Sequence, residues 1–209
     1  MAAAVATLVG VMALLVSGYT AYVQRQQVRA QVWPILLYGT GNSPALTLWL
    51  TNKGVGPAVI RHVLVTVDGE PMPRWRDVMT KLLGPGEYNY SQNTITDAVM
   101  APGEEMSLFA PLDKTGAPIP LRPPGSVGDR FNDERFRVGV EICYCSTLGE
   151  CWVLHQGPFG TPTTTPVPVC APDPKPFESI SASTVRTMNE NMLRAKQADA
   201  GARDARDAG

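Results

Sequence analysis

Four cysteines are the residues of this chain whose types and spacing are best suited to chemistry. Cys143, Cys145 and Cys151 lie close together in the sequence, and Cys170 follows later. Paired thiols form disulfides in an oxidising compartment, take part in redox exchange, or bind soft metal ions. Cys143 and Cys145 are separated by a single residue, which is not the spacing of a zinc knuckle, so the pattern disfavours a zinc site.

A β-hairpin must position three of these cysteines. Phe136 to Cys145 and Cys151 to Gln156 both alternate between the two faces of a strand. If Cys145 lies directly opposite Cys151, the apolar residues of the two strands match, whereas a slip by one residue loses the match. The predicted opposed pairs are Tyr144 with Trp152, Ile142 with Leu154, Cys143 with Val153, and Glu141 with His155.

This register predicts the disulfide pairing. Directly opposed cysteines on antiparallel strands have Cβ atoms near the separation that a disulfide requires, so we predict a Cys145–Cys151 bridge in an oxidising compartment. Cys143 lies diagonal to Cys151 and can instead meet Cys170 if the later chain folds back. Two other states stay open, namely reduced and inert cysteines, and a metal site made of three thiols with His155.

The other titratable residues do not form a recognisable active site. His62 shares a predicted strand face with Ile60 and Leu64, which favours packing over catalysis. His155 opposite Glu141 fits a cross-strand ion pair as well as an oriented base. The sequence contains neither a Gly-x-Ser-x-Gly elbow nor a Gly-x-x-x-x-Gly-Lys loop. We therefore expect no catalytic residue, no metal site and no cofactor.

Composition restricts the class of partner and the kind of fold. The net charge is −1, so no basic excess indicates a nucleic-acid partner. Proline and glycine are enriched at 19 residues each, which predicts many turns and few long helices.

Short apolar runs between turn signals predict a mostly β fold. We expect an immunoglobulin-like antiparallel β-sandwich over residues 32–160, with one short crossover helix over Pro73 to Leu83 that is capped by Gly84. Asp113 to Asp133 is rich in proline and glycine and is predicted to be a long loop, available for partner contact. The other predicted strands are Pro34 to Tyr38, Ala45 to Thr51, Ala58 to Val67, Tyr88 to Val99 and Glu105 to Ala110.

The N-terminal segment is predicted to be a transmembrane anchor at residues 1–24. No charged side chain occurs from Ala2 to Val23, and these residues span about 30 Å as a helix, enough to cross a bilayer. A cleaved signal peptide is the alternative. It is disfavoured because Arg25 and Arg29 follow the apolar stretch and no basic region precedes it. We expect a single-pass protein of the inner (cytoplasmic) membrane, with residues 24–31 as a short linker.

Two signals disagree about orientation. Arg25 and Arg29 follow the helix, so the positive-inside rule predicts a domain that faces the cytoplasm. The cysteine pattern favours a periplasmic or otherwise extracytoplasmic domain. We favour the extracytoplasmic orientation, and the cytoplasmic one stays open.

The C-terminal part is predicted to contain a Thr/Pro-rich linker at 161–176, an amphipathic helix at 177–196 and a disordered tail at 197–209. The apolar stripe of the helix can dock in a partner's groove or pack on its own domain, and both interpretations stay open. The residues of this stripe are Phe177, Ile180, Met188 and Met192.

Three motifs carry a resemblance. They are Val32-Trp33-Pro34, the run Asn52 to Ala58 (Asn-Lys-Gly-Val-Gly-Pro-Ala), and Cys143-Tyr144-Cys145-Ser146 followed by Cys151-Trp152. Together, from the anchor to about Trp152, they resemble a set of uncharacterised small bacterial membrane proteins with an N-terminal anchor. The resemblance implies a bacterial membrane setting and brings no activity.

We therefore hypothesise a membrane-anchored interaction or assembly module of the bacterial cell envelope, without catalytic chemistry. Its partners would be the membrane, through the N-terminal helix, and another envelope or membrane protein. The alternative is a thiol-dependent protein, redox or metal-binding, that uses the cysteine cluster.

Overall fold

The computed structural model describes residues 2–43, 45–119, 124–171 and 177. These belong to one compact unit, Met1–Phe177. The tail predicted at 197–209 and all of the helix predicted at 177–196 except Phe177 lie outside the described residues, together with Ile180, Met188 and Met192.

The chain begins with a long helix, α1 (Ala2–Gln31). From Ala3 to Gln31 this helix is long and apolar enough to cross a membrane. It continues through residues 24–31, where we predicted a linker, so that prediction is wrong. No proline or glycine interrupts this stretch, whereas Pro34 disfavours a helical conformation at Trp33 and the helix ends shortly before it.

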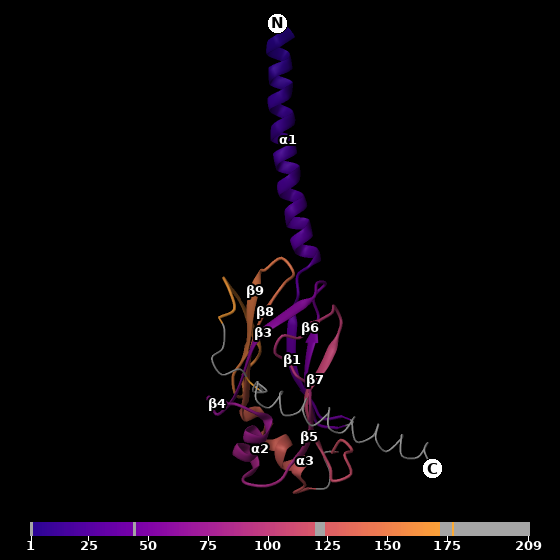
Figure 1. The fold of residues 1–209 in the computed structure, drawn as a ribbon, viewed down its shortest axis with the longest axis vertical. Helices are drawn as coiled ribbons and strands as arrows, with labels where there is room; N and C mark the ends of the chain where they lie inside the picture. Colours follow the sequence, from indigo (N-terminus) through magenta and orange to yellow (C-terminus); the bar gives the residue numbers. More distant parts are fainter. Residues whose placement is uncertain (1, 44, 120–123, 172–176, 178–209) are drawn as a thin grey trace, which may run out of the picture. The chain divides into compact units, whose positions relative to one another are not determined.

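Two antiparallel sheets follow α1, which confirms the predicted mostly β class (Figure 1). One sheet has the strand order β1-β2-β7-β5, and the other has the order β10-β9-β8-β3-β4, with β6 also paired to β3. The described elements after α1 are β1 (Leu36–Gly41), β2 (Thr47–Asn52), β3 (Ala58–Val67), β4 (Glu70–Met72), α2 (Trp75–Leu83), β5 (Asn89–Gln92), β6 (Val99–Met100), β7 (Glu105–Leu112), α3 (Val127–Glu134), the 3₁₀ turn η1 (Arg135–Arg137), β8 (Val138–Cys145), β9 (Cys151–Gln156) and β10 (Thr163–Val167).

The structure contains a second short helix that the sequence did not predict. The helix α3 and the turn η1 occupy the end of the segment predicted as a loop and the start of the predicted hairpin strand. The strand therefore begins at Val138 rather than Phe136, and the Phe136 ring is 45% exposed. Ser126 caps α3 by accepting a hydrogen bond from the backbone N–H of Asp129, at 3.2 Å.

Two further segments differ from the prediction. The stretch predicted as one strand over Tyr88 to Val99 forms β5 in one sheet and starts β6 in the other. Within the predicted linker at 161–176, β10 pairs with β9. Its Pro166 has no N–H to donate, which β10 tolerates because it is an edge strand.

A β-bulge changes the predicted face of β3. The predicted strand limits are correct, but the pairing with β8 shifts between Ile60 and His62. As a result Ile60 is fully buried on the core side with Val63, and it does not share a face with His62.

Aromatic side chains close one end of the two sheets. The Trp75 ring of α2 stacks on Phe109 of β7 with a centroid separation of 4.7 Å, and Phe109 lies 5.4 Å from Phe131 of α3. Phe177 meets Trp75 edge-on at 5.2 Å. The helices α2 and α3 lie side by side there (Figure 1). One core therefore joins the sheets, the short helices and Phe177.

The loop between β2 and β3 holds the chain that leaves α1. The backbone N–H groups of Val55 and Gly56 both donate to the Trp33 carbonyl, at 3.0 and 3.3 Å. A Cβ atom at Gly56 would lie 2.1 Å from the Val32 carbonyl carbon, so only glycine permits this approach. The polypeptide passes from helix to domain without a free linker.

Asn52 stabilises the same junction from inside. Its side chain is fully buried and makes four hydrogen bonds. The Oδ1 atom accepts from the N–H groups of Ile35 and Gly54, at 3.2 and 3.0 Å. The Nδ2 group donates to the carbonyls of Gly56 and Met100, at 2.8 and 3.1 Å. This one amide therefore ties β1, the β2–β3 loop and β6 together.

Candidate functional site

The cysteine cluster lies at the C-terminal end of β8. Cys145 pairs with Cys151 and Cys143 pairs with Cys170, with Cα–Cα separations of 4.0 and 5.7 Å. These are the pairings that the hairpin register indicated for an oxidised chain. The register itself is confirmed, with Tyr144 opposite Trp152, Ile142 opposite Leu154, Cys143 opposite Val153 and Glu141 opposite His155.

The two disulfides are close enough to touch. The Sγ atoms of Cys145 and Cys170, which belong to different bridges, lie 3.7 Å apart. The sulfurs of Cys145, Cys151 and Cys170 all lie within 4.8 Å of one another. A disulfide sulfur is not a thiolate, so zinc ligation would require prior reduction. Thiol–disulfide exchange between the bridges is the chemistry that this arrangement suits best.

His155 does not join the sulfur cluster in the described part of the chain, contrary to the metal site that we considered. Its Nδ1 atom lies 3.3 Å from the Glu141 carboxylate on an exposed face. The predicted cross-strand pair therefore forms. A hollow of about 590 Å³ borders the cluster, lined in part by Cys145, Cys170 and Arg61.

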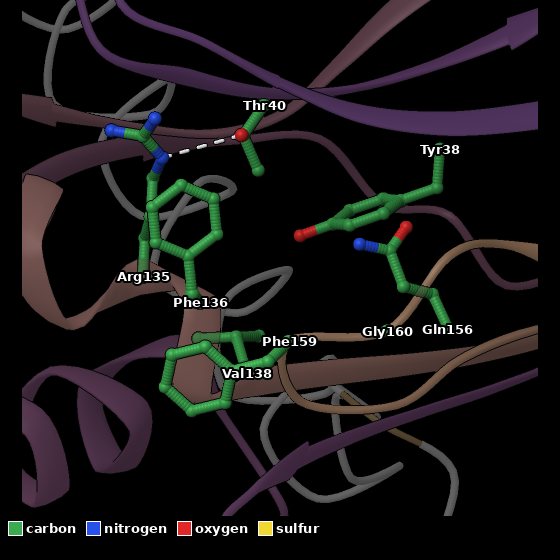
Figure 2. Close-up of a pocket in the computed structure, with 8 residues that line it drawn as sticks. All are labelled: Tyr38, Thr40, Arg135, Phe136, Val138, Gln156, Phe159 and Gly160. Carbon is green, nitrogen blue, oxygen red and sulfur yellow. Dashed lines mark hydrogen bonds between the residues drawn. The ribbon is translucent and has the colours of Figure 1, made fainter.

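A second candidate site lies near the opposite end of β8. It is a pocket of about 390 Å³ between β1 of one sheet and the β8 and β9 strands of the other. This volume falls within the range of small-molecule sites, about 300–1,000 Å³. Figure 2 shows aromatic and polar side chains facing one another across it. The lining residues are Tyr38, Thr40, Arg135, Phe136, Val138, Gln156, Phe159 and Gly160.

Arg135 provides the positive charge of this pocket. Its Nε donates to the Thr40 hydroxyl at 3.2 Å, its Nη1 donates to the Asn132 carbonyl at 3.4 Å, and the guanidinium lies 4.5 Å from the Phe136 ring centroid. Burial lowers the pKa of Arg135, while Tyr38 and Asp133 act in the opposite direction. A guanidinium stays charged under such a shift, so Arg135 is an oriented cation.

Two polar groups of the pocket lack partners. The Tyr38 hydroxyl and the Gln156 Oε1 atom are buried and make no hydrogen bond among the described residues. Burial raises the pKa of Tyr38, and the Arg135 charge only partly offsets the rise, so the hydroxyl is a neutral donor. The hydroxyl points into the pocket, with Gln156 beside it (Figure 2).

The sequence did not indicate this pocket. Tyr38 was part of a predicted strand, and Arg135 and Phe136 fell at the boundary between a predicted loop and a predicted strand. The contact between Arg135 and Thr40 joins residues 95 positions apart, so no local spacing shows it. The available signal was Arg135-Phe136-Arg137, a basic and aromatic run directly before an apolar strand.

Phe177 is the described member of the stripe that we considered for partner binding. It is 4% exposed and packs on Trp75, so its ring lies in the core and not on an open surface. For this residue the structure shows packing on its own domain.

Comparisons with protein-family models, with curated proteins and with solved structures find no match to this chain. Its function must therefore be argued from the two sites and from the junction with α1.

Proposed function

We propose that this protein is a membrane-anchored interaction module of the bacterial cell envelope. In this proposal α1 crosses the inner membrane once, the two-sheet domain is an immunoglobulin-like sandwich on the extracytoplasmic side, and the domain binds another membrane or envelope protein. The pocket around Arg135 is its recognition site, and no catalytic step is involved.

The observation that carries the proposal is that all three motifs of the bacterial resemblance meet at the junction between helix and domain. The β2–β3 loop holds the backbone at Trp33, and the Trp33 ring stacks on Trp152 with a centroid separation of 6.4 Å. Tyr144 also stacks on the Trp152 ring, with a centroid separation of 5.9 Å. A domain fixed to its helix in this way stays at the bilayer surface. That position favours a neighbour in the same membrane over a diffusing substrate.

The cysteines and Arg29 support the extracytoplasmic orientation. Two disulfides suit an oxidising compartment and are rare in the cytoplasm. The Arg29 guanidinium lies 2.9 Å from the Glu150 carboxylate in the β8–β9 loop. Since Arg29 forms this contact with the domain, its presence is explained without the positive-inside rule.

In-cell photocrosslinking of the full chain tests the proposal. A benzophenone amino acid replaces Phe159 at the pocket rim, which is 77% exposed, or Val99 on β6, which is 58% exposed and serves as the matched control. We expect a discrete crosslink to a membrane protein from position 159 and none from position 99. A flexible Gly/Ser insertion between Gln31 and Val32 should weaken the crosslink several-fold. Identical products from both positions would contradict the proposal.

A second function, thiol–disulfide exchange, is favoured by the 3.7 Å separation of the Cys145 and Cys170 sulfurs. A dithiol reductant would open Cys145–Cys151, becoming a disulfide itself while two electrons and two protons pass to the cysteines. The Cys145 thiolate would then attack the Cys170 sulfur. A Cys145–Cys170 bond would form, and Cys143 would leave as a thiolate.

Peptide mapping by mass spectrometry tests this second function. Under limited reduction with dithiothreitol, followed by alkylation, we expect a Cys145–Cys170 bond with Cys143 and Cys151 alkylated. The Cys145→Ala variant should never form a rearranged bond to Cys170 through this route. Recovery of only native pairs or fully reduced chains would exclude the exchange.

A further inference from the structure

We propose that the Arg135 pocket binds a free carboxylate that carries an adjacent amide N–H and an apolar side chain. This is the chemistry of a peptide's C-terminal residue and of an N-acyl amino acid. The inference rests on the proposed interaction function and names the group that a partner would present.

Arg135 is a cation that forms no ion pair with a carboxylate of the described residues. Arg29, Arg74 and Arg137 each form an ion pair with a carboxylate. Arg135 is only 9% exposed, yet no carboxylate of the described chain lies within ion-pair distance of it, and Asp133 acts on it only at longer range. A buried charge without a counter-ion is costly. The contacts with Thr40 and Asn132 use two of its five N–H donors, which leaves part of the planar fork for an oxygen pair.

The Tyr38 hydroxyl points into the same space. The Tyr38 side chain is 5% exposed and its oxygen has no partner in the part of the chain that the structure describes. Figure 2 shows it pointing into the pocket across from the Arg135–Phe136 pair. A neutral phenol donates a hydrogen bond to an anion and adds a second fixed donor beside the guanidinium.

Two further features of the pocket, an amide acceptor and an apolar surface, favour this ligand over a simple anion. Among the described residues the Gln156 Oε1 atom has no hydrogen-bond partner, so this acceptor is available to an N–H or O–H group of the ligand. Phe136, Val138 and Phe159 supply apolar surface beside it. An inorganic phosphate would satisfy the cation but would leave that surface without an apolar contact. A residue with a carboxylate, an amide N–H and a side chain matches all three parts.

The rim of the pocket is held in an unusual conformation. Phe159 has a φ of 54°, in the left-handed region that bulky residues rarely adopt. Its N–H donates to the Phe136 carbonyl at 2.8 Å, and the two rings stack at 6.4 Å. Such strain clusters at ligand sites. Here it keeps an exposed aromatic ring at the rim of the pocket.

Ligand binding to the full chain in nanodiscs tests this inference, measured by titration calorimetry or ligand-observed NMR. The probe is N-acetyl-phenylalanine, compared with its carboxamide and with 3-phenylpropionate, which lacks the amide. We expect the carboxamide to bind about tenfold more weakly, or about 1.4 kcal/mol, and 3-phenylpropionate several-fold more weakly. Inorganic phosphate, which can pair with Arg135 but makes no apolar contact, should compete only at a much higher concentration than the probe. Tighter binding of acetyl-Ala-Ala-Phe identifies a peptide C-terminus as the source, and equal binding identifies an N-acyl amino acid.

Three variants locate the site. Arg135→Met should weaken binding of N-acetyl-phenylalanine about tenfold or more, and Tyr38→Phe, which preserves the shape of the ring, should weaken it several-fold. Arg61→Met removes an exposed arginine outside the pocket and should leave binding unchanged. A melting curve of each variant establishes that it folds, and the carboxamide comparison tests the inference without any variant.

Equal binding of the acid and its carboxamide, or no binding of the acid at millimolar concentration, would overturn the carboxylate assignment. A crosslink that persists from position 159 in either case would leave the proposed interaction function standing. The two proposals can therefore fail separately.

Discussion

The two ends of β8 differ in how completely their polar and reactive groups are satisfied. At the Cys145 end, the four sulfurs are paired and the buried amide of Asn52 uses both its oxygen and its nitrogen. At the Val138 end, the buried Arg135 forms no ion pair with a carboxylate of the described residues and feels the charge of Asp133 only at longer range. A buried hydroxyl and an amide oxygen there have no partner among the described residues. The strand's eight residues separate these ends by about 23 Å.

This contrast assigns different roles to the two ends. Groups that are already paired hold the domain to α1, and a ligand would gain little by contacting them. Unpaired groups raise the free energy of the folded state until something pairs with them, so they are suited to binding. We name the first region the junction end and the second the pocket end. The following substitutions test the contrast.

The largest effect is expected from Asn52→Ala at the junction end. The variant leaves buried backbone groups of Gly54, Gly56 and Met100, and the partly buried N–H of Ile35, without their partner. Each unsatisfied group costs about 1–3 kcal/mol, so the free energy of unfolding should fall by about 4 kcal/mol or more. Urea denaturation followed by tryptophan fluorescence measures this.

Asn93→Ala is the matched control for Asn52→Ala. The Asn93 side chain also donates to a backbone carbonyl, that of Ser107 at 2.7 Å, but it is exposed. We expect a change below about 0.5 kcal/mol. If the two variants unfold within about 1 kcal/mol of each other, the junction end is less dependent on Asn52 than its contacts imply.

The disulfides provide the second test, because they close loops of different length. Cys143–Cys170 has a sequence separation of 27, and Cys145–Cys151 has a separation of 6. The chain-entropy model gives a stabilisation of about 3.6 kcal/mol for the longer loop and about 2.4 kcal/mol for the shorter one. The paired variant Cys143→Ala with Cys170→Ala should therefore be less stable than Cys145→Ala with Cys151→Ala. The reverse order, by urea denaturation, would be incompatible with this account.

The junction end could be predicted from the sequence to a greater extent than the pocket end. Period-two alternation and opposed cysteines specify the hairpin register, since any slip exposes apolar residues. The N-terminal apolar run likewise predicted a helix able to cross a membrane. Its extension to Gln31 was missed because residues 24–31 are polar, and polarity was taken as a linker although those residues are good helix formers.

The pocket end depends on features that local patterns do not reveal. The helix α3 has few apolar residues, with Phe131 as its one large buried side chain, so its period was not visible. The bulge in β3, which lies opposite Cys143 and Tyr144 at the junction end, was missed as well, because alternation alone did not locate it. Tyr38 and Arg135 meet only because two sheets pack together. A site formed by the packing of two sheets cannot be located without the folded structure.

Two buried tyrosines give the third test, with effects of opposite sign. Tyr144 belongs to the satisfied region, since its hydroxyl accepts from the Leu36 N–H at 3.5 Å and also interacts with Thr164. Tyr144→Phe should therefore destabilise the fold by about 1 kcal/mol. Tyr38→Phe removes a desolvated hydroxyl that has no partner within the described ranges, and it should stabilise the fold by about 1 kcal/mol.

Melting temperatures of the two tyrosine variants, measured in the same detergent, test whether the two hydroxyl groups affect stability with opposite signs. A rise for Tyr38→Phe together with weaker ligand binding would show that this hydroxyl is kept for recognition at the expense of stability. If Tyr38→Phe lowers the melting temperature as Tyr144→Phe does, the hydroxyl is not an unsatisfied group and the contrast between the two ends loses its main support.

The smallest effect is expected from the arginine beside the pocket that does have acidic partners. The Arg137 Nε donates to the Asp68 carboxylate at 2.9 Å, and its Nη1 donates to Glu134 at 2.6 Å. The hydrogen bond from Arg137 is the main reason that the pKa of Asp68 lies below its usual value. A carboxyl group with a lowered pKa in the folded state stabilises the fold above about pH 4, and this contribution is lost as the pH falls through the folded pKa.

Because Asp68 and Arg137 are solvent-accessible, the change in stability should be small. We expect the melting temperature of the wild type to exceed that of Asp68→Asn slightly at pH 7 and to converge with it near pH 3. In an Arg137→Met background, Asp68→Asn should have a smaller effect at pH 7, because only the weaker attraction of Lys81 for Asp68 remains. A difference that grows as the pH falls would mean that Asp68 is destabilised in the fold. Arg137 would then be no better paired than Arg135. The distinction between Arg137, which has acidic partners, and Arg135, which lines the pocket, would disappear.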